Sequence, residues 1–225
     1  TSDTLYSATK LFNKIFLGIE WFLFKTGTGA NSHLEAGGFV KSSSSILDPD
    51  IQFHFFPSFV INHGLEDPKF HGFQLHASLN RPKSRGEVSL KSSNPYDYPK
   101  IQFNYFKHKE DLIKTRECIH IARKILSQHS LSYFSDKEIS PGADVISDNE
   151  LNNYIKANAE TAYHPSCTLK MGTDKMSVVD ENLKVYGLSG IRVVDASIMP
   201  EITSGNINAP TIMIAEKASE LIKLD

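Results

Sequence analysis

The chain has 225 residues, 40% of them hydrophobic, and a formal net charge of −2 at pH 7. That length and apolar content are enough to bury a core in one large domain or two small ones. Near-neutral charge, with Lys and Arg scattered, argues against a nucleic-acid-binding protein, which should carry a basic face. Cys118 and Cys167 supply neither a disulfide framework nor a metal knuckle. We therefore expect a reducing, cytoplasmic setting and no metal site.

The chain opens with TSDTLYSATK, which contains no Met and no signal peptide, so we expect it to begin in mid-domain. Its most apolar stretch, residues 11–27, is interrupted by Lys14, Glu20 and Lys25. A helix that spans a bilayer needs roughly 20 largely uncharged residues. We therefore predict an amphipathic helix that packs onto the rest of the protein, with docking on a membrane surface as the alternative.

The glycine-rich stretch at residues 26–40, TGTGANSHLEAGGFV, does not fit a phosphate-binding loop. Gly27 and Gly29 match the start of Gly-x-Gly-x-x-Gly, but Ser32 stands at the third position. The stretch also follows a predicted helix, whereas the motif follows a strand. With Gly37 and Gly38 further on, a close-packed loop whose backbone approaches a ligand stays open.

Four segments alternate apolar and polar residues with a period of two, which predicts half-buried strands. They cover residues 51–56, 73–79, 87–91 and 101–106. The turn chemistry of RPKSRG, residues 81–86, predicts a hairpin between the second and third. We expect one antiparallel sheet with an apolar face. Its other face, rich in amides and imidazoles, either meets water or lines part of a substrate cavity.

Helices are predicted over residues 109–129, from residue 147 onward, and over residues 210–224. In the second, Ser147 and Glu150 have capping-box spacing. The expected apolar stripes, in chain order, are Ile119, Ala122, Ile125 and Leu126, then Leu151, Tyr154 and Ile155, then Ile214, Ala218, Leu221 and Ile222. The chain is therefore expected to combine helices with an antiparallel sheet.

A short strand is predicted at residues 184–186, and IRVVDASIMP, residues 191–200, indicates a buried strand that ends at Asp195. Ligands bind at the carboxyl ends of strands in open α/β sheets, so this carboxylate suits the hydroxyls of a ribityl or ribosyl chain. It suits a simple turn cap equally well. The amino end of the last helix, which follows Asn206, is either an anion-binding helix end or a capped surface end.

His164 stands in YHPSCTLKMG, residues 163–172, and has three interpretations. It is a catalytic base, a metal ligand beside Cys167, or a packed imidazole. A metal site needs further ligands, and the spacing supplies none. Cys167 as a nucleophile would need a base presented to it.

The order and spacing of YHPSCTLKMG, GIRVVDASIMP and SGNINAPTIMIAEKA resemble the carboxyl-terminal signature of the glucose–methanol–choline (GMC) oxidoreductases, flavoenzymes that oxidise alcohols. EWFLFKTGTGANSHLEAGGF, HGFQLHASLNRPKSRGEVSLKS and SDKEISPG resemble the bacterial choline dehydrogenase branch of that family. Many relatives read His-Pro-Ser-Gly-Thr-Cys where this chain has Cys167 and Leu169. These departures follow the histidine and bear on the shape of the loop.

The resemblance implies that His164 is the base that takes the alcohol proton while a hydride leaves carbon for flavin N5. Asn206 matches the position that hydrogen-bonds the reacting oxygen. Because an amide has no usable proton equilibrium, His164 would be the sole base. The flavin contacts implied by the resemblance are Asp195, Ala196, Asn208, Ala209, Pro210 and Thr211.

The implied fold is α+β. Residues 1–160 would form a substrate-binding domain, an antiparallel sheet flanked by helices. Residues 161–225 would supply the C-terminal strand and helix of a FAD-binding α/β domain. The dinucleotide fingerprint of that domain, which lies near the amino terminus in the family, is missing from this chain. We expect the chain alone to bind FAD weakly or not at all and to be inactive.

If the substrate is choline, the resemblance implies betaine aldehyde as the product, on the route to glycine betaine. Glu35 and His63 fall in segments that contribute to the substrate side, although Glu35 serves equally well as a loop-stabilising carboxylate. The resemblance also implies that the complete enzyme passes electrons to a membrane acceptor. The enzyme itself would lie in the cytoplasm or peripherally on the inner membrane. A neutral alcohol as substrate, a non-catalytic module and homo-oligomerisation all stay open.

Overall fold

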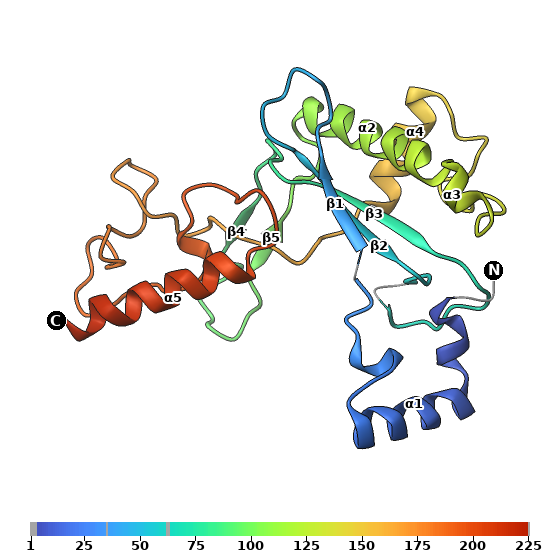
Figure 1. Ribbon diagram of the computed structural model, residues 1–225. Coiled ribbons are helices and arrows are strands. Elements are labelled where there is room, and N and C mark those ends of the chain that lie inside the picture. The colour runs from blue at the N-terminus through green and yellow to red at the C-terminus, as the bar shows by residue number, and fades with distance from the viewer. Residues whose placement is uncertain (1–3, 35, 62–63, 225) are drawn as a thin grey trace. The chain divides into compact units, whose positions relative to one another are not determined.

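The computed structural model describes residues 4–34, 36–61 and 64–224, and Figure 1 shows their helices and strands. The chain is α+β, as predicted, with antiparallel strands and helices. It divides into two compact units whose sequence segments alternate. The first comprises Thr1–Leu79 and Ile113–Ala157, and the second comprises Asn80–Leu112 and Asn158–Asp225.

The first unit contains a three-stranded antiparallel sheet. Its strands are β1 (Ala36–Val40), β2 (Ile51–Phe56) and β3 (Gln74–Leu79), with β2 in the centre. The alternation predicted for β2 is confirmed at Ile51 and Phe53, whose side chains are buried. Gly37 and Gly38 lie in strand β1 and not in a ligand-binding loop. A Cβ on Gly37 would lie 2.5 Å from the carbonyl oxygen of Phe53. The glycine is thus required by the neighbouring strand.

Helix α2 (Lys109–Leu126) covers the apolar side of this sheet. Ala122 and Ile125, from the predicted stripe, pack against the core, and Cys118 and Ile121 complete the face. This i, i+3, i+4, i+7 spacing is that of one helix face. The face packs on Ile51, Phe53, Leu75 and Leu79.

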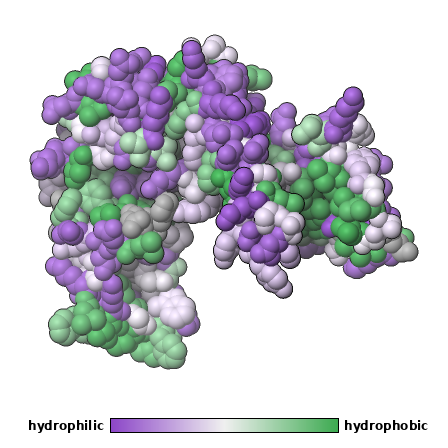
Figure 2. Space-filling model, turned by 180° about the vertical axis from the view of Figure 1, so that it is seen from behind, coloured by the Kyte–Doolittle hydropathy of each residue, from purple (hydrophilic) through white to green (hydrophobic). Residues whose placement is uncertain are grey.

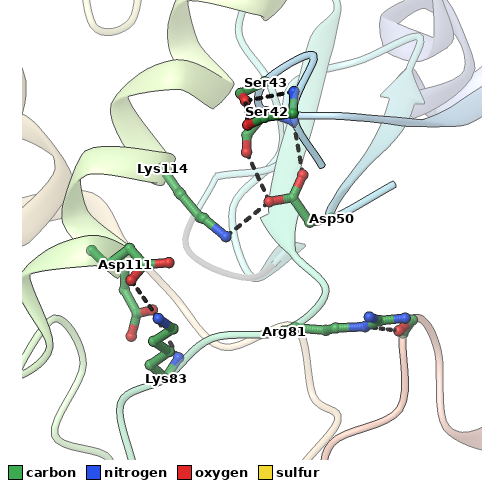
Figure 3. Close-up of polar contacts among 10 residues, drawn as sticks. Ser42, Ser43, Asp50, Arg81, Lys83, Asp111 and Lys114 are labelled. Atoms are coloured by element: carbon green, nitrogen blue, oxygen red, sulfur yellow. Dashed lines mark hydrogen bonds and ion pairs between the residues drawn. The ribbon is translucent and has the colours of Figure 1, made fainter. Parts of the chain in front are cut away.

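A buried carboxylate fastens α2 to the β1–β2 connection. Asp50 accepts hydrogen bonds from the Ser42 N–H at 2.7 Å and the Ser42 hydroxyl at 2.8 Å, and Lys114 Nζ lies 3.0 Å away (Figure 3). Burial raises the pKa of Asp50, but the bonds from Ser42 and Lys114 outweigh it and hold the pKa below its ordinary value. The ionised carboxylate is therefore the form that the fold requires.

Helix α4 (Asp148–Asn158) begins at the predicted capping box, and α3 (His129–Ser132) is a single turn before it. The Ser147 hydroxyl accepts from the Glu150 N–H at 3.3 Å, and Glu150 Oε2 accepts from the Ser147 N–H at 2.9 Å. Leu151 and Ile155 are buried, as the periodicity predicts. The helix start is thus encoded locally.

Helix α1 (Leu11–Phe24) lies against the short 3₁₀ turns η1 (Leu5–Thr9) and η2 (Thr28–Ala30). The helix itself is confirmed, and Lys14 pairs with Asp67, but most of the apolar side chains of α1 remain exposed among the described residues. Phe12, Phe16 and Phe22 are about 70% exposed, and Figure 2 shows apolar surface over this helix. Among the described residues, no helix combines the length and apolar character needed to cross a membrane.

In the second unit, β4 (Glu87–Ser89) pairs with β5 (Lys100–Gln102) in a separate two-stranded ladder. The predicted single sheet is therefore wrong, and so is the hairpin through residues 81–86. The carboxylate of Asp111 accepts from the N–H groups of Lys83 and Ser84, at 2.8 and 2.7 Å, and so fastens this turn to the first turn of α2.

The second unit has its own core beneath α5 (Asn208–Lys223), formed by Val179, Leu183, Ile198, Met199, Ile214 and Ala218. Ile214 and Ala218 lie on it as predicted, and Leu221 packs against it, whereas Ile222 is half-exposed. The strands expected at residues 184–186 and 191–195 are isolated bridges, among them Lys184 with Arg192. Val193 packs against the core, whereas Ile191 is half-exposed.

Candidate functional site

The loop that carries His164 is fixed against the segment that follows Asp195. The N–H groups of Cys167, Leu169 and Met171 donate to the carbonyl oxygens of Ala196, Ser197 and Ile198, at 3.3, 3.0 and 2.7 Å. Before this ladder, Tyr163 has a φ of 61°, and Cys167 at its start has a φ of 71°. These left-handed residues turn the chain sharply around His164.

The imidazole of His164 is half-buried, and it makes no hydrogen bond or ion pair within the described part of the chain. A packed histidine in a core normally has its ring nitrogens satisfied. In residues 4–34, 36–61 and 64–224, no group of three or more His, Cys, Asp or Glu residues could hold a metal ion. The ring thus has nitrogens available for a proton.

Asp195 acts as a turn cap in this structure. Its Oδ1 accepts from the Ser197 N–H at 2.7 Å and starts the 3₁₀ turn η4 (Ala196–Ile198). The predicted strand end is therefore an extended residue ahead of a short turn, with an exposed side chain. The cap uses Oδ1 of the carboxylate, so capping and ligand binding are compatible at this residue.

The amino end of α5 has no side-chain cap. Ile207 is the N-cap residue, and Asn208 and Ala209 are exposed. Thr211 donates both its N–H, at 3.0 Å, and its hydroxyl, at 2.7 Å, to the Ile207 carbonyl oxygen. The first-turn N–H groups carry partial positive charge. No side-chain cap bond forms at this helix end among the described residues, and the anion-binding interpretation stays a prediction.

The loop before α5 carries Asn206, which is exposed. Gly205 has a φ of 149°, and its N–H donates to the Thr203 carbonyl oxygen at 2.9 Å, so the loop turns tightly just before Asn206. Ser204 accepts a hydrogen bond from Arg81 Nε, across 123 positions of sequence. Sequence reasoning treated residues 81–86 only as a turn and missed this contact. A charged side chain next to the proline of that turn was the available signal.

Glu35 and His63, the residues expected on the substrate side, lie outside the described residues. The site residues that the structure does describe, from His164 to Thr211, all belong to the second unit. Within it, backbone hydrogen bonds join the His164 loop to η4. η4 contacts α5 in turn.

Comparison with known proteins identifies the family to which this chain belongs. The profile of the GMC oxidoreductases matches residues 82–215, more than half of the chain. The chain belongs to the GMC oxidoreductase family. It is 48% identical over 222 residues to the mitochondrial choline dehydrogenase of Mus musculus, covering 98% of this chain and 37% of that protein. It is 49% identical over 220 residues to an oxygen-dependent choline dehydrogenase of Burkholderia lata, covering 98% and 39%.

This GMC chain thus spans about two fifths of the length of these curated relatives. Among solved structures, pyridoxine 4-oxidase from Mesorbium loti matches with a TM-score of 0.79 at 27% identity, over 87% of this chain and 39% of that one. A formate oxidase of Aspergillus oryzae RIB40 matches with a TM-score of 0.85 at 24% identity, over 94% and 42%. The second likeness shows the fold alone.

Proposed function

We propose that this chain is the carboxyl-terminal part of a FAD-dependent choline dehydrogenase, which oxidises choline to betaine aldehyde on the route to glycine betaine. The observation that carries the proposal is the identity of 48–49% with two choline dehydrogenases, sustained over 98% of the chain. We place the substrate-binding domain at residues 1–160 and the end of the FAD-binding domain at residues 161–225.

The residues present fit a flavin. The uncapped amino end of α5 directs partial positive charge outward, and this suits the electron-rich pyrimidine side of a reduced flavin. In this proposal Asn208, Ala209, Pro210 and Thr211 hold that side, while Asp195 and Ala196 contact the cofactor at η4. When bound, FAD supplies the acceptor for the substrate hydride.

His164 acts in this proposal as the general base that removes the hydroxyl proton of choline. A half-buried imidazole whose ring nitrogens are not engaged by the described residues has a lone pair that can accept the proton. Asn206 donates its amide N–H to the substrate oxygen and orients it. Removal of the proton and positioning of the oxygen are thereby divided between two side chains.

A quaternary ammonium substrate is recognised by aromatic faces and carboxylates. We assign this role to Glu35, with His63 also on the substrate side. Electrons then pass to a membrane acceptor, consistent with an enzyme that is cytoplasmic or peripheral on the inner membrane.

The proposal is tested with the complete enzyme, reconstituted with FAD and reduced anaerobically by candidate alcohols. Choline should bleach the flavin absorbance within the turnover time, while aliphatic alcohols of similar size should act far more slowly. Equal rates of flavin reduction by choline and by neutral alcohols would contradict choline as the specific substrate. The chain by itself should not purify as a stoichiometric yellow protein.

A further inference from the structure

The turn at residues 81–86 is held rigidly at one end. Asp111 is only 3% exposed, and its two carboxylate oxygens accept separately from the N–H groups of Lys83 and Ser84. The Ser84 hydroxyl accepts from the His108 N–H at 3.0 Å. These bonds fix the main chain of the turn to the start of α2, and Figure 3 shows Asp111 beside Lys83.

Arg81 leaves this fixed turn and reaches the loop that carries Asn206. Its Nε donates to the Ser204 hydroxyl, and Figure 3 shows its side chain extended away from Lys83. Pro82 follows Arg81 and restricts its backbone to extended conformations, which limits the directions the guanidinium can take. The contact therefore joins a pinned turn to a distant loop within the same unit.

The loop on the other side is short and leads directly to the candidate site. The turn at Thr203–Gly205 is closed by the Gly205 N–H, Asn206 follows it, and α5 begins at Asn208. A displacement of Ser204 would therefore move Asn206 and the amino end of α5 together. Arg81 donates to the Ser204 hydroxyl in the middle of this turn.

We propose that Arg81 is a positioning residue that holds the Ser204–Asn208 loop in register with the substrate oxygen, acting through Ser204 and anchored by Asp111. This inference rests on the proposed alcohol oxidation and extends it to a residue that does not touch the substrate. A loss of orientation of about 1 Å in a catalytic group can cost about a hundredfold in rate. The long aliphatic stem and planar head of Arg give a fixed reach that a short polar residue lacks.

The test uses Arg81→Met and Ser204→Ala, singly and together, in the complete enzyme. Each single variant should lower kcat about tenfold to a hundredfold while KM changes much less and flavin content stays the same. The double variant should match the worse single variant, because both substitutions remove one contact. Full additivity of the two effects, or a normal kcat for Arg81→Met, would overturn the role.

Lys83→Met is the matched control. It removes a positive charge from the same turn but keeps the Lys83 N–H bond to Asp111, and its side chain pairs with Glu110 at the surface. This variant should keep the wild-type kcat. If it lost as much activity as Arg81→Met, the effect would come from the charge of the turn and the positioning role would fail.

A second readout does not depend on turnover. Hydrogen–deuterium exchange of the peptide that spans residues 203–208 should be faster in Arg81→Met and Ser204→Ala than in the wild-type enzyme and the Lys83→Met control. Unchanged exchange in Arg81→Met would refute the inference. If the wild-type enzyme failed to oxidise choline, the proposed function would fall, and the exchange measurement would still decide whether Arg81 orders the loop.

Discussion

The Met171 N–H donates a 2.7 Å hydrogen bond to the carbonyl oxygen of Ile198. Ile198 belongs to the core of the second unit, and Met171 packs against that core. The bond ends a ladder that begins at Cys167, three residues after His164. The loop of the candidate base is thus joined by backbone hydrogen bonds to η4 and to the core of the second unit.

His164→Ala in the complete enzyme should lower kcat by about 10²–10⁴-fold, because general base catalysis contributes on that scale. Flavin content should stay normal, since the backbone ladder after His164 does not use its side chain. Steady-state kinetics with choline and the flavin absorbance spectrum measure both quantities. His120→Ala, at an exposed position of α2, is the control. An equal loss of kcat in the two variants would contradict the role of His164 as the base.

Lys114→Met should destabilise the first unit, because it takes one partner from the buried Asp50 carboxylate. Hydrogen bonds to charged groups contribute about 1.5–3 kcal/mol, and a loss of that size is expected. Thermal unfolding of the variant against wild type measures it. Lys83→Met removes an exposed pair with Glu110 and should cost less than about 1 kcal/mol.

The stability supplied by Asp50 should depend on pH. Its pKa is lower in the folded protein than its ordinary value of 3.8, so the unfolded chain binds the proton more readily. The contribution is therefore fully present above about pH 4 and is lost as the pH falls through the folded-state value. Between pH 7 and pH 3, the thermal unfolding midpoint of Asp50→Asn should fall less steeply than that of the wild-type protein. An identical slope in the two proteins would contradict this account.

Ser147→Ala should weaken the start of α4 by about 1 kcal/mol, because it removes the cap of the Glu150 N–H. The bonds from Ser147 also hold the pKa of Glu150 below its ordinary value, so the substitution should raise that pKa. A pH titration of the Glu150 carboxyl by NMR checks the shift. Ser147→Asp, which can still cap, should keep most of the stability.

Cys118 should resist thiol reagents in the folded enzyme. Burial raises the pKa of its thiol to about 12, and the side chain is 1% exposed, so the reactive thiolate is neither formed nor reachable. Peptide mass spectrometry after iodoacetamide treatment at pH 8 should find Cys118 unmodified until a denaturant is added. Modification of Cys118 at the rate of a free thiol under native conditions would contradict its burial beneath the sheet.

The sequence predicted most of the individual elements because their signals are local. The apolar spacing of α2, α4 and α5 and the alternation in β2 are written within each segment, and the capping box of α4 lies within four residues. The family and the candidate base also came from short motifs around His164. The roles of His164, Asn206 and the flavin contacts remain proposals.

The pairings between segments could not be predicted in the same way. Alternation shows that a segment suits a sheet, but it does not say which neighbour it joins, so β4 was matched to β3 when its partner is β5. β1 was missed because its glycines resemble a loop, whereas Gly37 is needed for the close approach of Phe53. Ile191 and Val194 have strand-like side chains, but within the described part of the chain this segment forms only an isolated bridge, between Arg192 and Lys184.

By itself, the sequence determined the helices, the central strand and the family, since periodicity, caps and motifs depend on residues a few positions apart. Only the tertiary structure decided that Asp111 pins the turn at residues 81–86 and that Arg81 meets Ser204. It also decided that the His164 loop lies along η4. These contacts join segments separated by 27 to 123 positions. Such contacts form where a carboxylate, hydroxyl or carbonyl oxygen meets a donor from a distant segment, and that depends on the packing of the whole unit.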